Sequence, residues 1–415
     1  MKQNWKKNAA IFVGSQVLSL FGSSLVQYAI TWHITLTTKS GVYATLIIVC
    51  GILPIFFLAP FAGVWADRYN RKLLIVLADA GIALCTLILA ILFMSGYNAV
   101  WLIFVASGIR ALGSAVQYPA VGAMLPDLVP EEQLTRVNGI YSSLQSLITL
   151  VSPMLSGALL SMASIESVFF VDVSTAAIAI MVMLTFLQVP TRPGDTRRSS
   201  GDYLQELRLG IRYIGGQRYL RSFFAFCAVF LFMATPVAFL TPLQTARTFG
   251  GGVWQLTAVE FTFSLGMMVG GLIMAAWGGL KNRVHTIALS GFAMGITTIA
   301  LGVPRNFVVY LIVMTGFGLS MPAFGTQSTV MLQERVHPNY MGRVFGVMTT
   351  INSGMMPLGM MVFGPLADKI KIEWILIATG AMIMLASLAM LMDKHLVEEG
   401  SRNNCPQDVS LENAK

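Results

Sequence analysis

The sequence predicts an all-α integral membrane protein with twelve transmembrane helices in two pseudo-symmetric bundles of six. Three observations predict this class. The 415 residues are 55% hydrophobic and 11% charged, with a mean hydropathy of +0.71, whereas a soluble domain carries about 25% charged residues. Apolar runs of about 20 residues, the length that crosses a bilayer core, recur between short polar breaks. The similar segments 127–139 and 334–346 lie 207 residues apart, half of the chain.

Twelve apolar runs are long enough to cross a membrane as helices, which satisfy their own backbone hydrogen bonds. The first run follows a short basic segment and contains no cleavage-type site, so we expect a retained helix rather than a signal peptide. The expected spans are 8–36, 43–66, 73–95, 99–121, 137–163, 167–189, 221–247, 255–280, 285–304, 306–331, 342–367 and 372–392.

The two copies of the repeat predict four regions. These are an N-terminal bundle over 1–189, a cytoplasmic linker over 190–220, a C-terminal bundle over 221–395 and a polar cytoplasmic tail over 396–415. Such parallel repeats are typical of transporters whose binding site lies near the midplane. Within the linker, apolar residues recur at helical spacing, which predicts an amphipathic helix on the inner leaflet. They are Tyr203, Leu204, Leu207, Ile211 and Ile214.

Lysine and arginine predict the orientation of the chain in the membrane. With the N terminus inside, 21 of the 27 basic residues fall in inner segments and five in outer segments. By the positive-inside rule, both termini are expected in the cytoplasm, beneath a bacterial plasma (inner) membrane. The net charge of +8 then reflects the orientation of the chain in the membrane, and contact with anionic lipid head groups is also consistent with it. Nothing indicates nucleic-acid binding.

Catalytic and metal-binding patterns are missing from the sequence. The four cysteines and four histidines are scattered without the spacing of metal ligands. There is no phosphate-binding glycine loop followed by Lys-Ser or Lys-Thr, and no nucleophile elbow. We therefore expect neither an enzyme, nor a metal, nor a cofactor.

The stretch GVWADRYNRK, residues 63–72, resembles the loop between helices 2 and 3 of the major facilitator superfamily. Asn70 stands at the position of a second glycine, and because Asn tolerates left-handed backbone we expect the tight turn to survive. The residues that match the family pattern are Gly63, Asp67, Arg68, Arg71 and Lys72.

The resemblance implies a latch at this loop. Asp67 would meet the positive N-terminal end of the helix that starts near Tyr340, and Arg68 and Arg71 would pair with acidic groups. Such contacts would hold the cytoplasmic side shut in the outward-open state. An ordinary positive-inside loop is the alternative. The matching stretch at 278–285 lacks the aspartate, so a weaker latch or none is expected there.

Two further stretches resemble patterns of the same superfamily. In SGIRALGSAV, residues 107–116, Arg110 and Gly113 match a fourth-helix pattern. SPMLSG, residues 152–157, resembles the fifth-helix pattern of antiporters, in which small residues and a proline allow tight helix packing. Its members here are Ser152, Pro153, Ser156 and Gly157. Generic helix packing accounts for this stretch as well.

Four ionisable residues fall well inside the predicted spans, away from the membrane surface, where a charge costs roughly 3 kcal/mol on insertion scales. Asp79 lies about two turns into the third helix, and Asp172 and Glu260 lie in the outer parts of the sixth and eighth. Such an acid could carry the proton that drives export, with Arg110 forcing its release. A structural ion pair is the alternative reading for each.

Helices 1, 4, 7 and 10 line the substrate cavity in proteins that this chain resembles, and the neighbouring helix 11 adds residues in this chain. The large number of Met and Phe residues, 25 of each, suits varied amphiphiles, although lipid-facing packing also accounts for them. No basic cluster would hold a phosphate or dicarboxylate. The cavity residues expected here are Gln27, Trp32, Gln117, Phe230, Met233, Gln244, Met321, Phe324, Asn352 and Met355.

Within the superfamily, the chain resembles the macrolide-efflux branch over nearly its whole length. The shared landmarks include SQVLSLFGSSLVQYAITW, DRYNRK, PDLVPEEQL and YMGRVFG. The resemblance implies a monomeric antiporter in the lipid bilayer that exchanges protons for a hydrophobic or amphiphilic, macrolide-like drug by alternating access. Export of a lipid, siderophore or other metabolite, proton-coupled import, and a non-transporting receptor are the alternatives.

Overall fold

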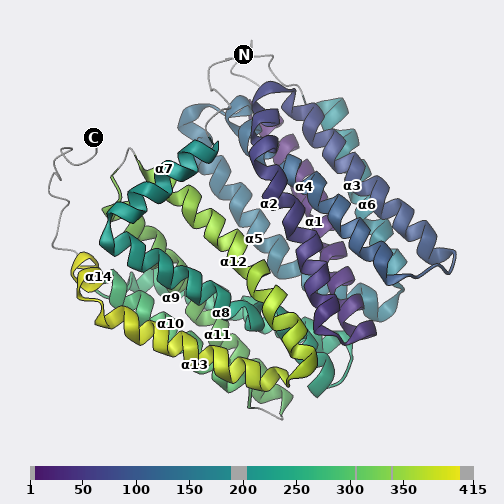
Figure 1. The fold of residues 1–415 in the computed structure, drawn as a ribbon. Helices are drawn as coiled ribbons and strands as arrows, with labels where there is room; N and C mark the ends of the chain where they lie inside the picture. The colour runs from purple at the N-terminus through teal and green to yellow at the C-terminus, as the bar shows by residue number, and fades with distance from the viewer. Residues whose placement is uncertain (1–4, 188–202, 304–305, 338–339, 402–415) are drawn as a thin grey trace. The chain divides into compact units, whose positions relative to one another are not determined.

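The computed structural model describes residues 5–187, 203–303, 306–337 and 340–401, and these form fourteen helices (Figure 1). The first part of the expected linker and most of the expected tail lie outside the described residues. The helices are α1 (Trp5–Thr38), α2 (Gly41–Arg68), α3 (Arg71–Met94), α4 (Val100–Leu128), α5 (Glu131–Met162), α6 (Ile165–Phe186), α7 (Tyr203–Gly216), α8 (Arg218–Thr248), α9 (Val253–Trp277), α10 (Arg283–Leu301), α11 (Phe307–Arg335), α12 (Met341–Lys369), α13 (Ile372–Met392) and α14 (Lys394–Glu399).

Twelve of these helices match the twelve expected spans, and α7 and α14 are shorter additions. Eleven of the described helices are long and apolar enough to cross a membrane. The exception among the expected spans is α12, whose hydropathy is lowered by the polar run at 349–353. Large apolar side chains lie exposed on outer helix faces, such as Phe57 at 64% and Leu385 at 65%. In a chain of this class such faces meet lipid tails rather than water.

The chain divides into two compact units. Unit 1 comprises Met1–Ser200 and Thr245–Phe261, and unit 2 comprises Gly201–Gln244 and Thr262–Lys415. In unit 1, α3 packs against α4 and α6, and α1 packs against α5 and α6. In unit 2, α10 packs against α11 and α13. The pairing of α3 with α4 and α6 is thus repeated about 210 residues later, as the sequence repeat leads one to expect.

Asparagine begins the third helix of each repeat. Asn70 has φ −63° and ψ 109°, and its side chain accepts a hydrogen bond from the Leu73 amide at 3.2 Å. Asn282 caps α10 in the same way, through the Val284 amide at 2.9 Å. The expected left-handed turn at Asn70 is therefore wrong. An N-cap residue needs extended backbone so that its side chain can satisfy a free helix N–H.

The expected amphipathic helix is present as α7, and it packs against α12 of its own unit. Ile214 is buried, whereas Ile211 is 56% exposed. The ring of Tyr213 stacks on Tyr340 with centroids 4.3 Å apart, and the Arg343 guanidinium lies 5.4 Å from the Tyr340 ring. One face of α7 thus contacts protein and the opposite side is open, as an interfacial helix requires.

Candidate functional site

Polar side chains on four helices form a belt across the middle of unit 1. Helix α3 contributes Asp79 and Thr86 to this belt, and α4 contributes Arg110 and Gln117. Within each helix the two residues are seven positions apart, so they project from one helix face and lie about 10.5 Å apart along its axis. The belt therefore has two layers, named here after Arg110 and Asp79. The members of this polar belt are Gln16, Ser19 and Ser23 of α1, Asp79 and Thr86 of α3, Arg110 and Gln117 of α4, and Asp172 of α6.

The Arg110 layer is built on an ion pair. Nη1 of Arg110 lies 2.5 Å from Oδ2 of Asp172, and their side chains are 9% and 1% exposed. Nη2 of Arg110 donates to the Ser23 carbonyl at 3.2 Å, and Arg110 also donates to the Thr86 hydroxyl. Asp172 accepts from Thr86 Oγ1 at 3.1 Å and from Ser23 Oγ at 3.3 Å. Both charges are thus compensated by partners from α1, α3, α4 and α6.

The Asp79 layer is satisfied on one side only. Oδ1 of Asp79 accepts hydrogen bonds from Ser19 Oγ at 2.8 Å and from Gln117 Nε2 at 2.7 Å. Gln16 lies beside them and donates to the Met183 sulfur at 3.3 Å. Oδ2 of Asp79 has no hydrogen-bond partner among the described residues, although the residue is only 2% exposed. Such a buried, unpartnered oxygen is unusual in a folded protein.

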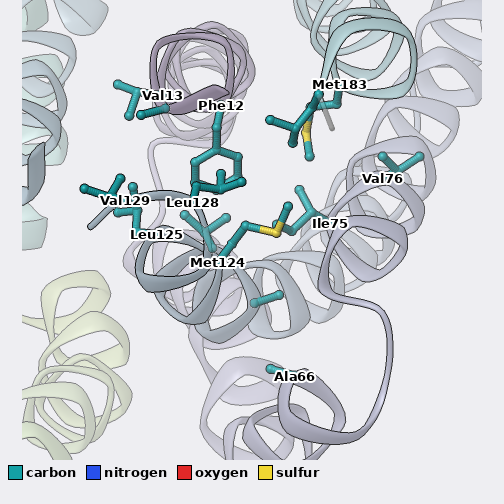
Figure 2. Packing of buried hydrophobic residues seen from close by; sticks show 14 residues of the cluster. Phe12, Val13, Ala66, Ile75, Val76, Met124, Leu125, Leu128, Val129 and Met183 are labelled. Carbon is teal, nitrogen blue, oxygen red and sulfur yellow. The ribbon is translucent and has the colours of Figure 1, made fainter. Parts of the chain in front are cut away.

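Apolar clusters close the belt at both ends. Beside the Asp79 layer, Phe12 of α1, Ile75 of α3, Met124 of α4 and Met183 of α6 pack together (Figure 2). Beyond the Arg110 layer, a second cluster takes Ile30, Leu89, Ile103 and Phe169 from the same four helices. Along each of these helices the polar members of the belt therefore lie between two apolar clusters, with Asp79, Arg110 and Asp172 buried and Ser23 and Gln117 half-buried.

The belt brings together three of the four ionisable residues that the sequence singled out. Arg110 pairs with Asp172, and Asp79 lies in the neighbouring layer, within electrostatic range of Asp172. Glu260 lies elsewhere, half-buried on α9 and within electrostatic range of Tyr28 of α1.

Sequence reasoning missed the hydroxyl partners in the belt, which are Ser19, Ser23 and Thr86. The signal that could have found Thr86 is its spacing. It follows Asp79 by seven residues, as Gln117 follows Arg110 on the adjacent helix. A repeat of that length places successive polar groups on one helix face.

The turn between α2 and α3 is anchored by Arg71. Its Nε donates to the Ala66 carbonyl at 2.9 Å, and its Nη1 lies 2.5 Å from Asp127 Oδ2 at the end of α4. Lys72 Nζ donates to the Leu187 carbonyl at 2.9 Å. The remaining predicted latch residues lie on α2. Gly63 is half-buried, Arg68 is exposed and Asp67 is helical, with its side chain outside the described part of the structure.

Unit 2 carries an equivalent of the Arg71 anchor. Arg283 Nη2 lies 2.8 Å from Glu334 Oε1, at the end of α11, and Nη1 donates to Gln327 Oε1 at 3.1 Å. Each arginine also donates to the carbonyl five residues before it, Ala66 or Gly278. The stretch at 278–285 thus retains the basic half of the motif, with a glutamate in the place of Asp127.

The antiporter-type stretch of α5 faces α1 and α9 within unit 1. Ser156 Oγ donates to the Leu25 carbonyl at 3.0 Å, and Ser152 and Pro153 are buried. A Cβ at Gly157 would collide with the Thr257 side chain and press on Trp32. An open, mainly apolar hollow of about 350 Å³ adjoins Gly157 between α5 and α9. These residues therefore act as close-packing positions.

The expected cavity residues have different surroundings. Gln117 belongs to the polar belt, Trp32 is buried and Gln27 is exposed. Gln244 is buried in unit 2, where its amide donates to the Leu301 carbonyl at 2.9 Å and accepts from the Tyr310 hydroxyl at 3.0 Å. Phe230 stacks on Phe324, with centroids 4.1 Å apart. Met233, Met321 and Met355 are half-buried, and Asn352 is exposed.

No group of three or more His, Cys, Asp or Glu residues that could hold a metal ion occurs in the described part of the chain. In the belt, Arg110 and Asp172 compensate each other's charge inside an apolar bundle, and Asp79 lies in the neighbouring layer. That arrangement can hold a charge pair away from water and can bind or release a proton at a carboxylate. It offers no activated nucleophile.

Known proteins resemble the chain at the level of sequence and of fold. The family model described as Major Facilitator Superfamily matches residues 12–360. Macrolide efflux protein A of Streptococcus pyogenes is 30% identical over 394 residues, which are 94% of this chain and 97% of that protein. The staphyloferrin A transporter of Staphylococcus aureus is 25% identical over 86% of this chain and 89% of that protein.

The fold agrees with this assignment. The crystal structure of the nucleoside transporter NupG superposes with a TM-score of 0.70 at 12% identity, and covers 92% of this chain and 99% of that one. Family match, full-length relatives and fold all agree with the multi-pass helical architecture described above. The chain therefore belongs to the major facilitator superfamily of secondary transporters.

Proposed function

We propose that the chain exports hydrophobic or amphiphilic drugs, macrolide-like in size and polarity, across the plasma membrane of a bacterium. The observation that carries this proposal is the 30% identity to macrolide efflux protein A over 94% of this chain. The similarity runs along almost the whole length of both proteins and is not confined to one bundle. It therefore supports a related substrate class more than fold likeness alone would.

The chemistry of the belt supports a substrate without strong negative charge. Arg110 is the only basic residue within the middle of the described spans of unit 1, and it is already bound to Asp172 at 2.5 Å. Its guanidinium is therefore not available to hold a phosphate or a carboxylate. The abundance of Met and Phe suits a site that adapts to bulky apolar compounds.

Proton antiport with alternating access is the proposed mechanism. The support for it is that four ionisable groups, Asp79, Arg110, Asp172 and Glu260, lie inside spans where each is costly to keep. A carboxylate would take up a proton on the outer side and release that proton inside, and the free energy of the proton gradient would drive the substrate out. Asp67 and Arg68 are proposed to act at the loop latch, with both termini in the cytoplasm as the distribution of basic residues indicates.

Export of a siderophore is the second candidate, because the chain is also 25% identical to a staphyloferrin A transporter over 86% of its length. The two candidates differ in the polarity of the compound that moves. A drug exporter should transport apolar compounds of several chemical classes, whereas a siderophore exporter should transport one polar chelator and ignore the drugs.

The test is transport by the purified protein in proteoliposomes with an imposed pH gradient. The probes are erythromycin, a tetracycline, ethidium and staphyloferrin A, and protein-free liposomes are the control. We expect erythromycin to move against its gradient, and a protonophore to abolish that movement. Movement of the siderophore alone supports the second candidate, and no movement of any probe contradicts both.

A further inference from the structure

One oxygen of Asp79 is buried without a partner, and this feature is not explained by packing. Oδ1 accepts two hydrogen bonds, from Ser19 and Gln117, while Oδ2 has no partner among the described residues. The residue is 2% exposed. An ionised carboxylate with an uncompensated oxygen costs far more in apolar surroundings than the neutral acid does. The geometry therefore suits Asp79 as a carboxylic acid.

Asp172, one layer away, is in the opposite situation. It accepts from the Arg110 guanidinium, the Thr86 hydroxyl and the Ser23 hydroxyl, so both of its oxygens are engaged. These donors suit the charged form of the carboxylate. A second negative charge on Asp79 would be repelled by Asp172, with which it interacts electrostatically. The two acids of the belt are therefore divided into one that stays charged and one that can be neutral.

The groups around Asp79 come from four helices besides its own, α1, α4, α5 and α6. Ser19 and Gln16 face it from α1, and Gln117 faces it from α4, where Arg110 lies one layer away, bound to Asp172. The charged group on α6 is Asp172, and Tyr141 of α5 lies within electrostatic range. No basic side chain in the described structure is hydrogen-bonded to Asp79. The apolar cluster that contains Phe12 and Met124 (Figure 2) lies on the same helices as the layer, next to it along the chain.

We propose that Asp79 is the carboxyl group that binds the exchangeable proton, at Oδ2, and that the Arg110–Asp172 pair is a fixed anchor that does not exchange one. This inference rests on the proposed proton antiport, because it assigns the coupling proton to one of the four ionisable residues. The step is the addition of one proton to the Asp79 carboxylate and, later in the cycle, its loss. Ser19 and Gln117 position Oδ1, so that protonation is directed to Oδ2.

Infrared difference spectroscopy of the protein in lipid, titrated with acid in the absence of any drug, tests the assignment directly. A protonated carboxyl in apolar surroundings has a distinct C=O stretching band. We expect this band to titrate in the wild-type protein, to vanish in Asp79→Asn and to persist in Glu260→Gln, the matched control. Asn keeps an oxygen for the Ser19 and Gln117 hydrogen bonds, so the variant is expected to fold.

A second variant, Gln117→Leu, keeps the carboxyl but removes one donor to Oδ1. The band is then expected to persist and to move to higher wavenumber, which holds even if Asp79→Asn does not fold. A band that survives in Asp79→Asn, is lost in Glu260→Gln, or is unmoved in Gln117→Leu overturns the assignment. A band that responds to Na⁺ at constant pH also overturns it, because the layer would then bind a cation.

Drug transport provides a separate readout. Asp79→Asn is expected to retain passive erythromycin exchange in proteoliposomes. The increase in transport rate that a pH gradient causes should be at least ten-fold smaller in this variant than in the wild-type protein. Failure of the wild-type protein to move erythromycin refutes the proposed drug export and leaves the infrared result standing. Full gradient-driven transport by Asp79→Asn refutes the assignment of the proton.

Discussion

Replacing Asp172 with Asn is expected to destabilise unit 1 by about 4 kcal/mol, because it leaves the Arg110 charge buried without a counter-charge. The side chains are 9% and 1% exposed, so solvent screens the pair little. At 2.5 Å and an effective dielectric constant of about 20, the attraction between unit charges is roughly 6 to 7 kcal/mol. The amide oxygen of Asn still accepts from Arg110, which retains about 1 to 3 kcal/mol. The difference is the expected cost.

A double substitution separates the charge from the volume that the side chains fill. Arg110→Met removes the guanidinium while keeping most of the apolar stem, and the amide that Asp172→Asn introduces would retain the Thr86 and Ser23 hydroxyls as donors. The variant Arg110→Met with Asp172→Asn is therefore expected to cost only about 1 to 2 kcal/mol, less than Asp172→Asn alone. Such recovery is characteristic of buried ion pairs, in which an unpaired charge costs more than no charge.

The assay is reversible unfolding in mixed micelles titrated with a denaturing detergent and followed by tryptophan fluorescence. The wild-type protein, both single variants and the double variant are measured in the same lipid. Hydrogen bonds between membrane helices often contribute only about 0.6 kcal/mol. A cost below about 1 kcal/mol for Asp172→Asn, or a double variant that loses the sum of the two singles, would refute the reasoning about the ion pair.

Three further predictions concern the rest of the molecule. Arg71→Gln should cost up to about 1 kcal/mol, less than the buried pair, because Arg71 and Asp127 are 27% and 17% exposed; an equal loss in the same unfolding assay contradicts this. Gly318→Leu should cost about 1 to 3 kcal/mol, since a Cβ there would collide with the Phe263 carbonyl; unchanged thermal stability contradicts it. The hydrogen bond from Ser222, foremost, and those from backbone amides lower the pKa of Asp393. The Asp393 carboxylate should therefore stabilise α14 at any pH above the ordinary Asp pKa of about 4, and this stabilisation should be lost only as the pH falls through the lowered pKa. Hydrogen exchange of the backbone amides of 394–401 would report the loss.

The helices were predictable because a membrane-spanning helix can be recognised from the amino-acid composition of a segment of about 20 residues. The first run was expected over 8–36 and α1 covers Trp5–Thr38; the linker helix was expected from Tyr203 and α7 begins there. Length and apolar content decide whether a segment can satisfy its backbone in lipid, and neither depends on the partner helix. The same argument explains why α12 is the weak member of the twelve, since its polar run 349–353 lowers its hydropathy.

The site was only partly predictable because pairing depends on helix packing. Asp172 and Arg110 were each singled out by their cost in the membrane, but 62 residues separate them, and nothing in the sequence says that α6 and α4 bring them together. Asn70 was misread for a related reason. Its side chain could stabilise a left-handed turn or cap a helix, and the start of α3 one residue later decides for the cap.

The internal repeat shows where the two halves diverge. Arg71 with Asp127 and Arg283 with Glu334 are retained in both halves, so the anchor at these helix ends serves each unit's own fold. At the level of the belt the repeat is not retained. The residues 207 positions after Arg110 and Gln117 are Phe317 and Phe324, and Phe324 stacks on Phe230. Among the described residues, the mid-span ion pair therefore belongs to unit 1, and aromatic stacking takes its place in unit 2. The two units share the anchor at their helix ends but solve the packing of their interiors with different chemistry, which is why the repeat in the sequence did not predict the belt.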